Sequence, residues 1–254
     1  MRILTFNLSG KTAFFRMNDI NDGDIVYSYG HIHKVALLGL LGAIIGLSGH
    51  NKEFLIKGNN YVHPEFYNKL ETLKVGIKPN GHEGSFLRKK QNMTNGCGYI
   101  KKGNTLMYTE QWLYNVNWDI FLNLDSIEKE LANKLENYII ENKAIYIPYL
   151  GKNNHQAIIS NPKVVEGTIN NKKDIVINSL FDTENDLISI KKNENPFDKS
   201  NLNKFDYREI LPYSYTSTNC MYKKHMFSYT NKMCTVNKFT SDIINVNELN
   251  IYMI

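Results

Sequence analysis

The sequence has few cysteines and none of the short motifs that mark common enzyme classes. Cys97, Cys220 and Cys234 stand far apart, with no C-x-x-C pair and an odd total, which argues against a disulfide framework or a zinc knuckle. No P-loop, G-x-S-x-G or dinucleotide fingerprint occurs, and no carboxylate cluster has the spacing of a metal nuclease. We expect no metal, no cofactor and a reducing, cytoplasmic location.

The sequence also lacks a hydrophobic run long enough to cross a membrane. Residues 35–47 form a run of 13 residues without a polar side chain, whereas a spanning helix needs about 20. No apolar stretch of signal-peptide length follows Met1, because residues 2–8 are typical of a strand closed by a turn at Ser9 and Gly10. We therefore expect a helix over 35–47 that is buried inside a soluble domain, with no membrane partner.

Three glycines give this expected helix a smooth face. Gly39, Gly42 and Gly46 are three and four positions apart, so they lie on one side of a helix. Each costs about 1 kcal/mol relative to alanine. We expect that cost to be offset by a neighbouring backbone, most simply a sheet, lying close against the glycines.

The order of the remaining patterns predicts the fold class. An apolar stripe that follows an Asp125–Glu128 capping box predicts a helix to about Glu141. We expect further strands over 25–29, 54–56, 72–77, 118–124 and 144–147, and a short helix over 65–70. Without its insert, the chain then reads strand, helix, strand, strand, helix, strand. That is the split βαββαβ pattern of an α+β, ferredoxin-like (RRM/RAMP) domain, whose sheet leaves one face open to RNA.

The sequence changes character near residue 160. We expect residues 1–160 to form the ferredoxin-like RNA-binding domain and residues 161–254 a small β-rich C-terminal region. The strands predicted for this region are 164–169, 174–178, 207–215, 221–229 and 234–239, with a long loop over 184–206.

Positive charge is concentrated in the insert. Residues 74–104 carry seven lysines and arginines against Glu83 alone, a local charge of +6 in a chain whose total is +5. Residues 78–108 are rich in glycine and asparagine, and residues 86–90 and 99–102 flank a tip over 91–98. This pattern predicts a projecting β-hairpin, a thumb, that binds a polyanion. A solvated lysine-rich loop is the alternative.

Two groups of residues are candidate RNA contacts. On the hairpin, five cations suit phosphates and two aromatic rings suit stacking on bases: Arg88, Lys89, Lys90, Lys101, Lys102, Phe86 and Tyr99. Around the start of the 35–47 helix, Lys11, Arg16 and Lys34 would meet an RNA end beside the helix amides.

Histidines offer a second chemistry. His31 and His33 would face the same way on a strand, but a metal site needs a third ligand and none lies near in sequence; a polar start to the helix is the favoured interpretation. His82, His155, His225 and Tyr99 are residue types that a nuclease uses. The chain has 16 tyrosines and 30 lysines and arginines, so residues of these types occur together by chance. Their presence therefore assigns no catalytic residue.

Three ordered motifs resemble one family. They are Ile3-Leu-Thr-Phe6 with Gly10-Lys-Thr-Ala-Phe-Phe-Arg16, the tyrosine-rich approach to Leu38–Leu47, and Pro148-Tyr-Leu-Gly-Lys152. Together they resemble the Cas-five family of CRISPR-associated proteins, type I-B branch, over the first 160 residues. His31, His33 and Lys34 depart from the family, in which many relatives have Pro and Thr or Ser there. We count these three, with Tyr149 and Lys152 of the last motif, among the candidate RNA-binding residues.

The resemblance implies a subunit of Cascade, the RNA-guided surveillance complex of antiviral defence. Such a subunit holds the 5′ handle of the CRISPR RNA under its thumb and contacts the backbone subunit and the large subunit. Target DNA is then read by base pairing with the guide, as in another RNA-guided effector. We expect a non-enzymatic protein. The alternatives are a metal-independent endoribonuclease that processes CRISPR repeat RNA, since a type I-C branch uses Tyr, Lys and His, and a protein scaffold tethered by the basic arm.

Overall fold

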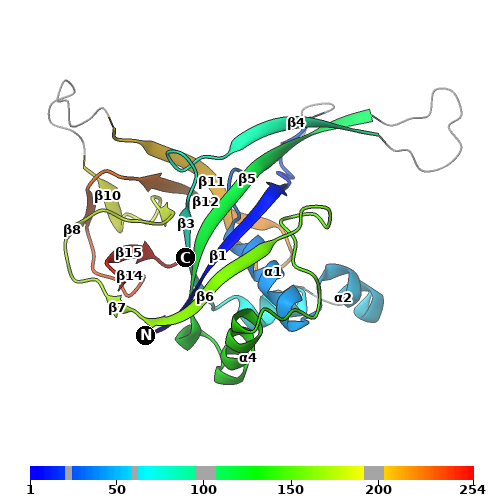
Figure 1. The fold of residues 1–254 in the computed structure, drawn as a ribbon, viewed down its shortest axis with the longest axis horizontal. Coiled ribbons are helices and arrows are strands. Elements are labelled where there is room, and N and C mark those ends of the chain that lie inside the picture. The colour runs from blue at the N-terminus through cyan, green and yellow to red at the C-terminus, as the bar shows by residue number, and fades with distance from the viewer. Residues whose placement is uncertain (21–24, 59–61, 95–106, 192–202) are drawn as a thin grey trace, which may run out of the picture.

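A computed structural model describes residues 1–20, 25–58, 62–94, 107–191 and 203–254 (Figure 1). The predicted residues Tyr99, Lys101 and Lys102 lie outside this part of the chain, as does Cys97.

A six-stranded mixed sheet organises the fold. Strands β1 (Arg2–Ala13) and β5 (Met107–Asn123) pair antiparallel at its centre, flanked by β6 (Ile158–Glu166) beside β1 and by β3 (Lys74–Pro79) beside one end of β5. The other end of β5 pairs antiparallel with β4 (Leu87–Thr94) and parallel with β2 (Ile25–Val26). Across the sheet, strands β6, β1, β5 and β3 lie side by side in that order.

Alternation along β1 and β5 builds the core. The opposed pairs Leu4–Leu122, Phe6–Ile120 and Leu8–Trp118 are almost fully buried on one face, as expected for strand side chains of period two. Helices lie on this side of the sheet (Figure 1): α1 (Lys34–Ile45), α2 (His50–Lys57), α3 (Glu65–Leu70) and α4 (Lys129–Ile140). On the opposite face, Ile3 and Phe121 join a separate small apolar cluster with residues of the C-terminal hairpin.

The apolar run predicted to be a buried helix is α1, so that prediction is confirmed. The expectation for its glycine face is wrong, because helix α3 rather than the sheet lies against it. A Cβ atom on Gly42 would come 2.5 Å from Cβ of Phe66. Gly46 does not belong to the helix face: it ends the helix with φ 82°, a left-handed conformation that glycine adopts at least cost.

Two expected strands are absent from the described chain. Residues 54–56 lie in helix α2. Residues 144–147 form a loop that closes the end of α1, because the N–H groups of Ile145 and Tyr146 donate to the carbonyls of Ile44 and Ala43 at 2.9 and 3.1 Å. The fourth strand of the pattern is instead β6.

Two expected local signals are also wrong. The chain does not turn at Ser9 and Gly10, because β1 continues to Ala13; a Cβ on Gly10 would lie 2.5 Å from Cδ1 of Leu150, so the glycine makes room for a neighbouring loop. No capping box forms before α4. Asp125 lies in a short 3-10 turn (Leu124–Ser126), and the helix starts after Glu128 without a side-chain cap.

The C-terminal region is rich in strands, arranged in three small sheets. β9 (Phe181–Asp182), β11 (Asp206–Tyr215) and β12 (Tyr222–Thr230) form the first; β8 (Asp174–Ile175), β10 (Ile188–Ile190) and β13 (Cys234–Val236) the second; β7 (Thr168–Ile169), β14 (Ile243–Val246) and β15 (Leu249–Tyr252) the third. Leu211 and Phe227 of the first sheet belong to the main core cluster. The division near residue 160 stays a prediction, and β6 runs across it.

Within the described residues no single helix is long and apolar enough to span a bilayer, although α1 and α2 taken together meet the length and composition test across a bend of 71°.

Candidate nucleic-acid interface

Strands β4 and β5 form a two-stranded extension that projects from the sheet (Figure 1). They pair from Leu87 opposite Tyr114 to Thr94 opposite Met107. At about 3.3 Å per residue, the 17-residue β5 is long enough to be both a core strand and one arm of a hairpin. The first predicted arm is therefore confirmed, whereas the predicted arm over 99–102 lies outside the described residues.

In the described part of the hairpin, Lys89 and Lys90 are exposed cations. In the described chain neither lies within ion-pair distance of a carboxylate, and the Nζ atom of Lys89 is 4.8 Å from the ring centre of Tyr114. β4 has β5 as its only strand partner in the described sheet, so it is an edge. Because neighbouring strand residues point to opposite faces, the two lysines flank this edge on both sides.

Arg88, a predicted RNA contact, forms an ion pair within the protein. Its Nη2 atom lies 3.7 Å from Oε1 of Glu209 on β11, and this carboxylate is 10 % exposed. Glu209 also accepts hydrogen bonds from the N–H of Gly30, at 2.8 and 3.1 Å to its two oxygens, and from the hydroxyl of Tyr207 at 2.8 Å. Burial raises the pKa of Glu209, and the hydrogen bonds from Gly30 and Tyr207 and the charge of Arg88 oppose the shift. Arg88 therefore joins the hairpin to β11 and to the segment before α1.

Replacing Glu209 with Gln is expected to loosen this junction. The amide keeps the shape but loses the charge that faces Arg88, which is 39 % exposed and so partly screened. We expect the free energy of unfolding in urea to fall by about 1–2 kcal/mol. Glu248→Gln, an exposed carboxylate, is the control; equal effects of the two changes would contradict the proposed junction.

His31 and His33 are buried, which corrects their prediction as RNA contacts. The side chain of His31 is 0 % exposed, and its Nδ1 accepts the indole N–H of Trp118 at 3.2 Å. Nδ1 of His33 accepts the N–H of Ala36 at 3.3 Å and caps α1. The favoured polar start to the helix is thus confirmed. Among the described residues no group of three possible ligands could hold a metal.

Burial also sets the charge of both rings. Desolvation lowers the pKa of His31 to about 3, with the nearby charge of Arg88 acting in the same direction, and desolvation alone lowers the pKa of His33 to about 3. An indole or backbone N–H can only donate, so each histidine must keep Nδ1 free of a proton. Both are neutral at physiological pH.

Phe86 packs at the root of the hairpin. Its ring meets those of Trp118 and His31 edge-on, with centroids 5.0 and 5.6 Å apart. It is half-buried in this aromatic cluster, so the predicted stacking of Phe86 on an RNA base is replaced by packing against the core.

The predicted cation group at the start of α1 does not form. Nζ of Lys34 donates to the carbonyl of Ile254 at 3.0 Å, and desolvation, with Lys74 nearby, lowers its pKa to about 8. Lys11 and Arg16 are both exposed, and Arg16 forms an isolated bridge with Ser28 just before the helix. These two remain candidate contacts.

The Pro148–Lys152 motif contacts strand β5 of the hairpin through Lys152. Nζ of Lys152 lies 2.8 Å from Oε1 of Glu110, whose other oxygen accepts the indole N–H of Trp112 at 2.8 Å. His155 is buried too, with Nδ1 2.7 Å from Oγ1 of Thr12. The charge of Lys152 is therefore neutralised, while Tyr149 is 45 % exposed and remains a candidate contact.

A group of polar residues on the face of the sheet opposite the helices was not predicted from the sequence. Asn7 and Asn80 both donate to Oδ1 of Asn117 at 2.7 Å, and Nζ of Lys78 lies 2.9 Å from Oδ2 of Asp119. The alternation of polar and apolar residues along β1 was the available signal. Lys74 is likewise 2.5 Å from Oδ1 of Asp242. Three of the five described cations between residues 74 and 90 thus face carboxylates, which concentrates the free charge on Lys89 and Lys90.

Comparison with known proteins gives the fold a context. No family model and no curated protein matches the chain. A chain of a structure described as "CRISPR RNA-guided surveillance complex" is similar with a TM-score of 0.50 and 13 % identity, over 91 % of this chain and 90 % of that one. A CRISPR protein from Archaeoglobus fulgidus is similar with a TM-score of 0.51 and 10 % identity, over 99 % and 98 %. At these identities the likeness concerns the fold, so this chain has a mixed α/β fold similar to that of CRISPR-associated proteins.

Proposed function

We propose that this protein is a non-catalytic subunit of a type I, I-B-like CRISPR Cascade complex that binds the 5′ handle of the CRISPR RNA. The observation that carries the proposal is the β4–β5 extension, whose edge bears Lys89 and Lys90 without a carboxylate partner among the described residues. The shared fold supports the CRISPR context. In this proposal the sheet and its helices are a ferredoxin-like frame of the Cas-five family, acting in the cytoplasm.

The geometry of the β4–β5 extension suits contacts with the phosphates of an RNA backbone. Phosphates that run along the β4 edge would meet one lysine from each face of the hairpin. Arg88 and Phe86 would act from the root, where they hold the extension against β11 and Trp118. Sequence would be read by base pairing between guide and target, which leaves the protein to recognise backbone and shape.

Three of the histidines are buried, whereas two others are accessible. A general acid or base must come within hydrogen-bond reach of the group it serves. His31, His33 and His155 are at most 4 % exposed, but His82 is exposed and the side chain of His225 is 31 % exposed, so experiment decides between a non-catalytic role and the endoribonuclease alternative. The endoribonuclease alternative is tested by incubating the purified protein with labelled repeat RNA in EDTA. We expect intact RNA, whereas one specific cut would replace this proposal.

Neutralising the two free lysines is expected to weaken RNA binding. Each phosphate contact on a single strand contributes about −0.7 to the slope of log affinity against log salt. Lys89→Gln with Lys90→Gln should therefore flatten the slope for handle RNA by about 1.4, and lower affinity by roughly tenfold or more near 100 mM salt. Filter binding across a salt series measures both quantities.

Lys172→Gln with Lys173→Gln is the matched control, since these lysines are also adjacent and exposed but lie in the C-terminal region. We expect the control to bind like the wild type. If the two double variants changed the slope equally, attraction by overall charge would explain the binding and the hairpin assignment would fail.

A further inference from the structure

The end of the molecule at which α1 terminates displays two apolar segments. The first is the loop after α4, which is fixed there by hydrogen bonds from Ile145 and Tyr146 to the last carbonyls of α1. The second is α2, which begins at His50, five positions after α1 ends at Ile45. Both segments are therefore attached to the same end of the same helix.

The loop after α4 exposes most of its large apolar side chains. Three consecutive residues, 145–147, are exposed, and Ile147 is 76 % exposed. A strand at these positions would bury every second side chain, but here the backbone serves as a helix cap and its side chains turn outward. The exposed apolar residues of this loop are Ile145, Tyr146, Ile147 and Tyr149, and Ile140 at the end of α4 precedes them.

Helix α2 shows the reverse of the usual helix pattern. Phe54, Leu55 and Ile56 are exposed, Leu55 to 83 %, whereas its acidic residue Glu53 is buried and lies 2.7 Å from Nζ of Lys57. A surface helix normally turns its apolar side to the core. We call these three residues, the four of the loop and Ile140 the α1-end surface.

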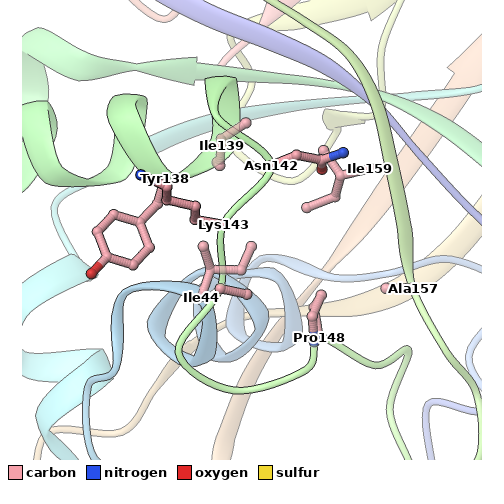
Figure 2. Close-up of a pocket in the computed structure, with 9 residues that line it drawn as sticks. Ile44, Tyr138, Ile139, Asn142, Lys143, Pro148, Ala157 and Ile159 are labelled. Carbon is pink, nitrogen blue, oxygen red and sulfur yellow. The ribbon is translucent and has the colours of Figure 1, made fainter.

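A hollow of about 180 Å³ lies between helix α1, helix α4 and the loop that follows α4 (Figure 2). Ile44 of α1, Ile139 of α4 and Pro148 of the loop contribute to its mainly apolar lining. The figure shows these side chains pointing toward a common space from three separate elements. Such a hollow suits a single apolar side chain from another molecule.

The extent and charge of the surface identify the class of partner. If each large side chain contributes its exposed share of roughly 150–250 Å², the surface amounts to about 1,000 Å². Monomers rarely expose apolar patches above a few hundred Å², whereas a protein interface buries about 800 Å² on each side. Lys57 and Lys143 are paired with Glu53 and Glu141, so Lys52 is the one lysine of α2 without an ion pair in the described chain.

We propose that the α1-end surface docks a neighbouring protein subunit, which inserts one apolar side chain into the hollow. The identity of that partner as a subunit of the same CRISPR complex rests on the proposed function; the apolar surface itself does not. Its centre would be Leu55 and Ile147, the most exposed apolar side chains of the two segments.

The test uses the full chain, tagged, co-expressed with the protein subunits encoded beside it and with the guide RNA. Leu55→Asp with Ile147→Asp places two charges on the α1-end surface. Met221→Asp with Phe239→Asp is the control, because these side chains are 67 % and 65 % exposed but lie in the C-terminal region. Recovered subunits, recovered guide RNA and thermal unfolding are measured for each protein.

We expect the surface variant to recover at least tenfold less of a protein subunit, to keep its guide RNA and to unfold like the wild type, while the control recovers both. A surface variant that recovers every subunit overturns the docking surface and leaves the proposed function intact. A wild-type chain that recovers neither RNA nor subunits overturns the proposed function instead.

Two alternative occupants of the α1-end surface, a second copy of the chain and a lipid membrane, are tested by separate measurements. Light scattering of the wild-type chain alone should give a monomer; a dimer that Leu55→Asp with Ile147→Asp dissociates would assign the surface to a second copy. Sedimentation with phosphatidylcholine vesicles should leave the protein in solution. Binding to vesicles that the same variant abolishes would assign the surface to lipid and overturn the proposal.

Discussion

Lowering the pH from 6.5 to 5 is expected to reduce the free energy of unfolding by about 3 kcal/mol. His31 and His33 have pKa values lowered to about 3 in the folded protein, against the ordinary value of 6.5. Between these two values the unfolded chain binds more protons than the folded one, so stability falls as the pH falls. Each histidine contributes about 1.1 kcal/mol per pH unit on average across this window, because the unfolded ring is only half protonated at pH 6.5.

The contacts explain why the folded state resists protonation. A proton on Nδ1 of either ring would displace the donor that the ring already accepts, the indole N–H of Trp118 or the N–H of Ala36. Burial lowers the pKa of His50 and His155 too, which acts in the same direction. Carboxylates titrate mainly below pH 5, so the window chosen reports chiefly on histidines.

Urea unfolding at half-unit steps of pH measures the effect. His33→Asn is the informative variant, since asparagine is a good helix N-cap and does not titrate. We expect it to remove about half of the slope contributed by the pair. A wild-type stability that stays level between pH 6.5 and 5, or a slope that His33→Asn leaves unchanged, would refute the neutral buried pair.

Trp118→Ala is expected to cost about 3–5 kcal/mol, the range for removing a fully buried aromatic side chain. Trp118 is 0 % exposed and meets Phe86 edge-on at 5.0 Å and Phe15 at 6.1 Å. It links the sheet, the root of the hairpin and His31. Because whole domains have only about 5–15 kcal/mol of stability, this variant is measured in the cold by urea unfolding.

Trp118→Phe separates the hydrogen bond from the packing. It keeps most of the ring volume but leaves Nδ1 of His31 without its donor, which we expect to cost about 1–3 kcal/mol. Handle-RNA affinity should stay unchanged in this folded variant, because Trp118 does not reach the surface. If Trp118→Ala cost less than about 1 kcal/mol, well below that range, the site would not be the packed junction described here.

Local sequence predicted the elements whose burial follows from their own pattern. The apolar run of α1 leaves few alternatives, and the strands expected over 207–215 and 221–229 agree closely with β11 and β12. Residues 54–56 and 144–147 carry the same apolar signal but are exposed. Composition alone cannot distinguish an apolar segment that packs inside from one that lies on the surface.

The candidate site was harder to predict because its decisive contacts are distant in sequence. Arg88 and Glu209 are 121 positions apart, and Lys152 meets Glu110 across another loop. A count of charges along residues 74–104 therefore overstates the charge available to RNA. The first arm of the hairpin was predictable from its basic sequence, although β4 runs on to Thr94, into the predicted tip. Its pairing with residues 107–114 of β5 and the pairing of its cations required the three-dimensional arrangement.

Sequencing the RNA that co-purifies with the protein tests the central claim most directly. Tagged chain is purified from cells that carry its complex and a CRISPR array, and the bound RNA is sequenced. We predict guide transcripts with a uniform 5′ end derived from the repeat, depleted when Lys89 and Lys90 are changed to Gln. Random cellular RNA, or the absence of RNA, would contradict a protein built to hold a guide by its 5′ handle.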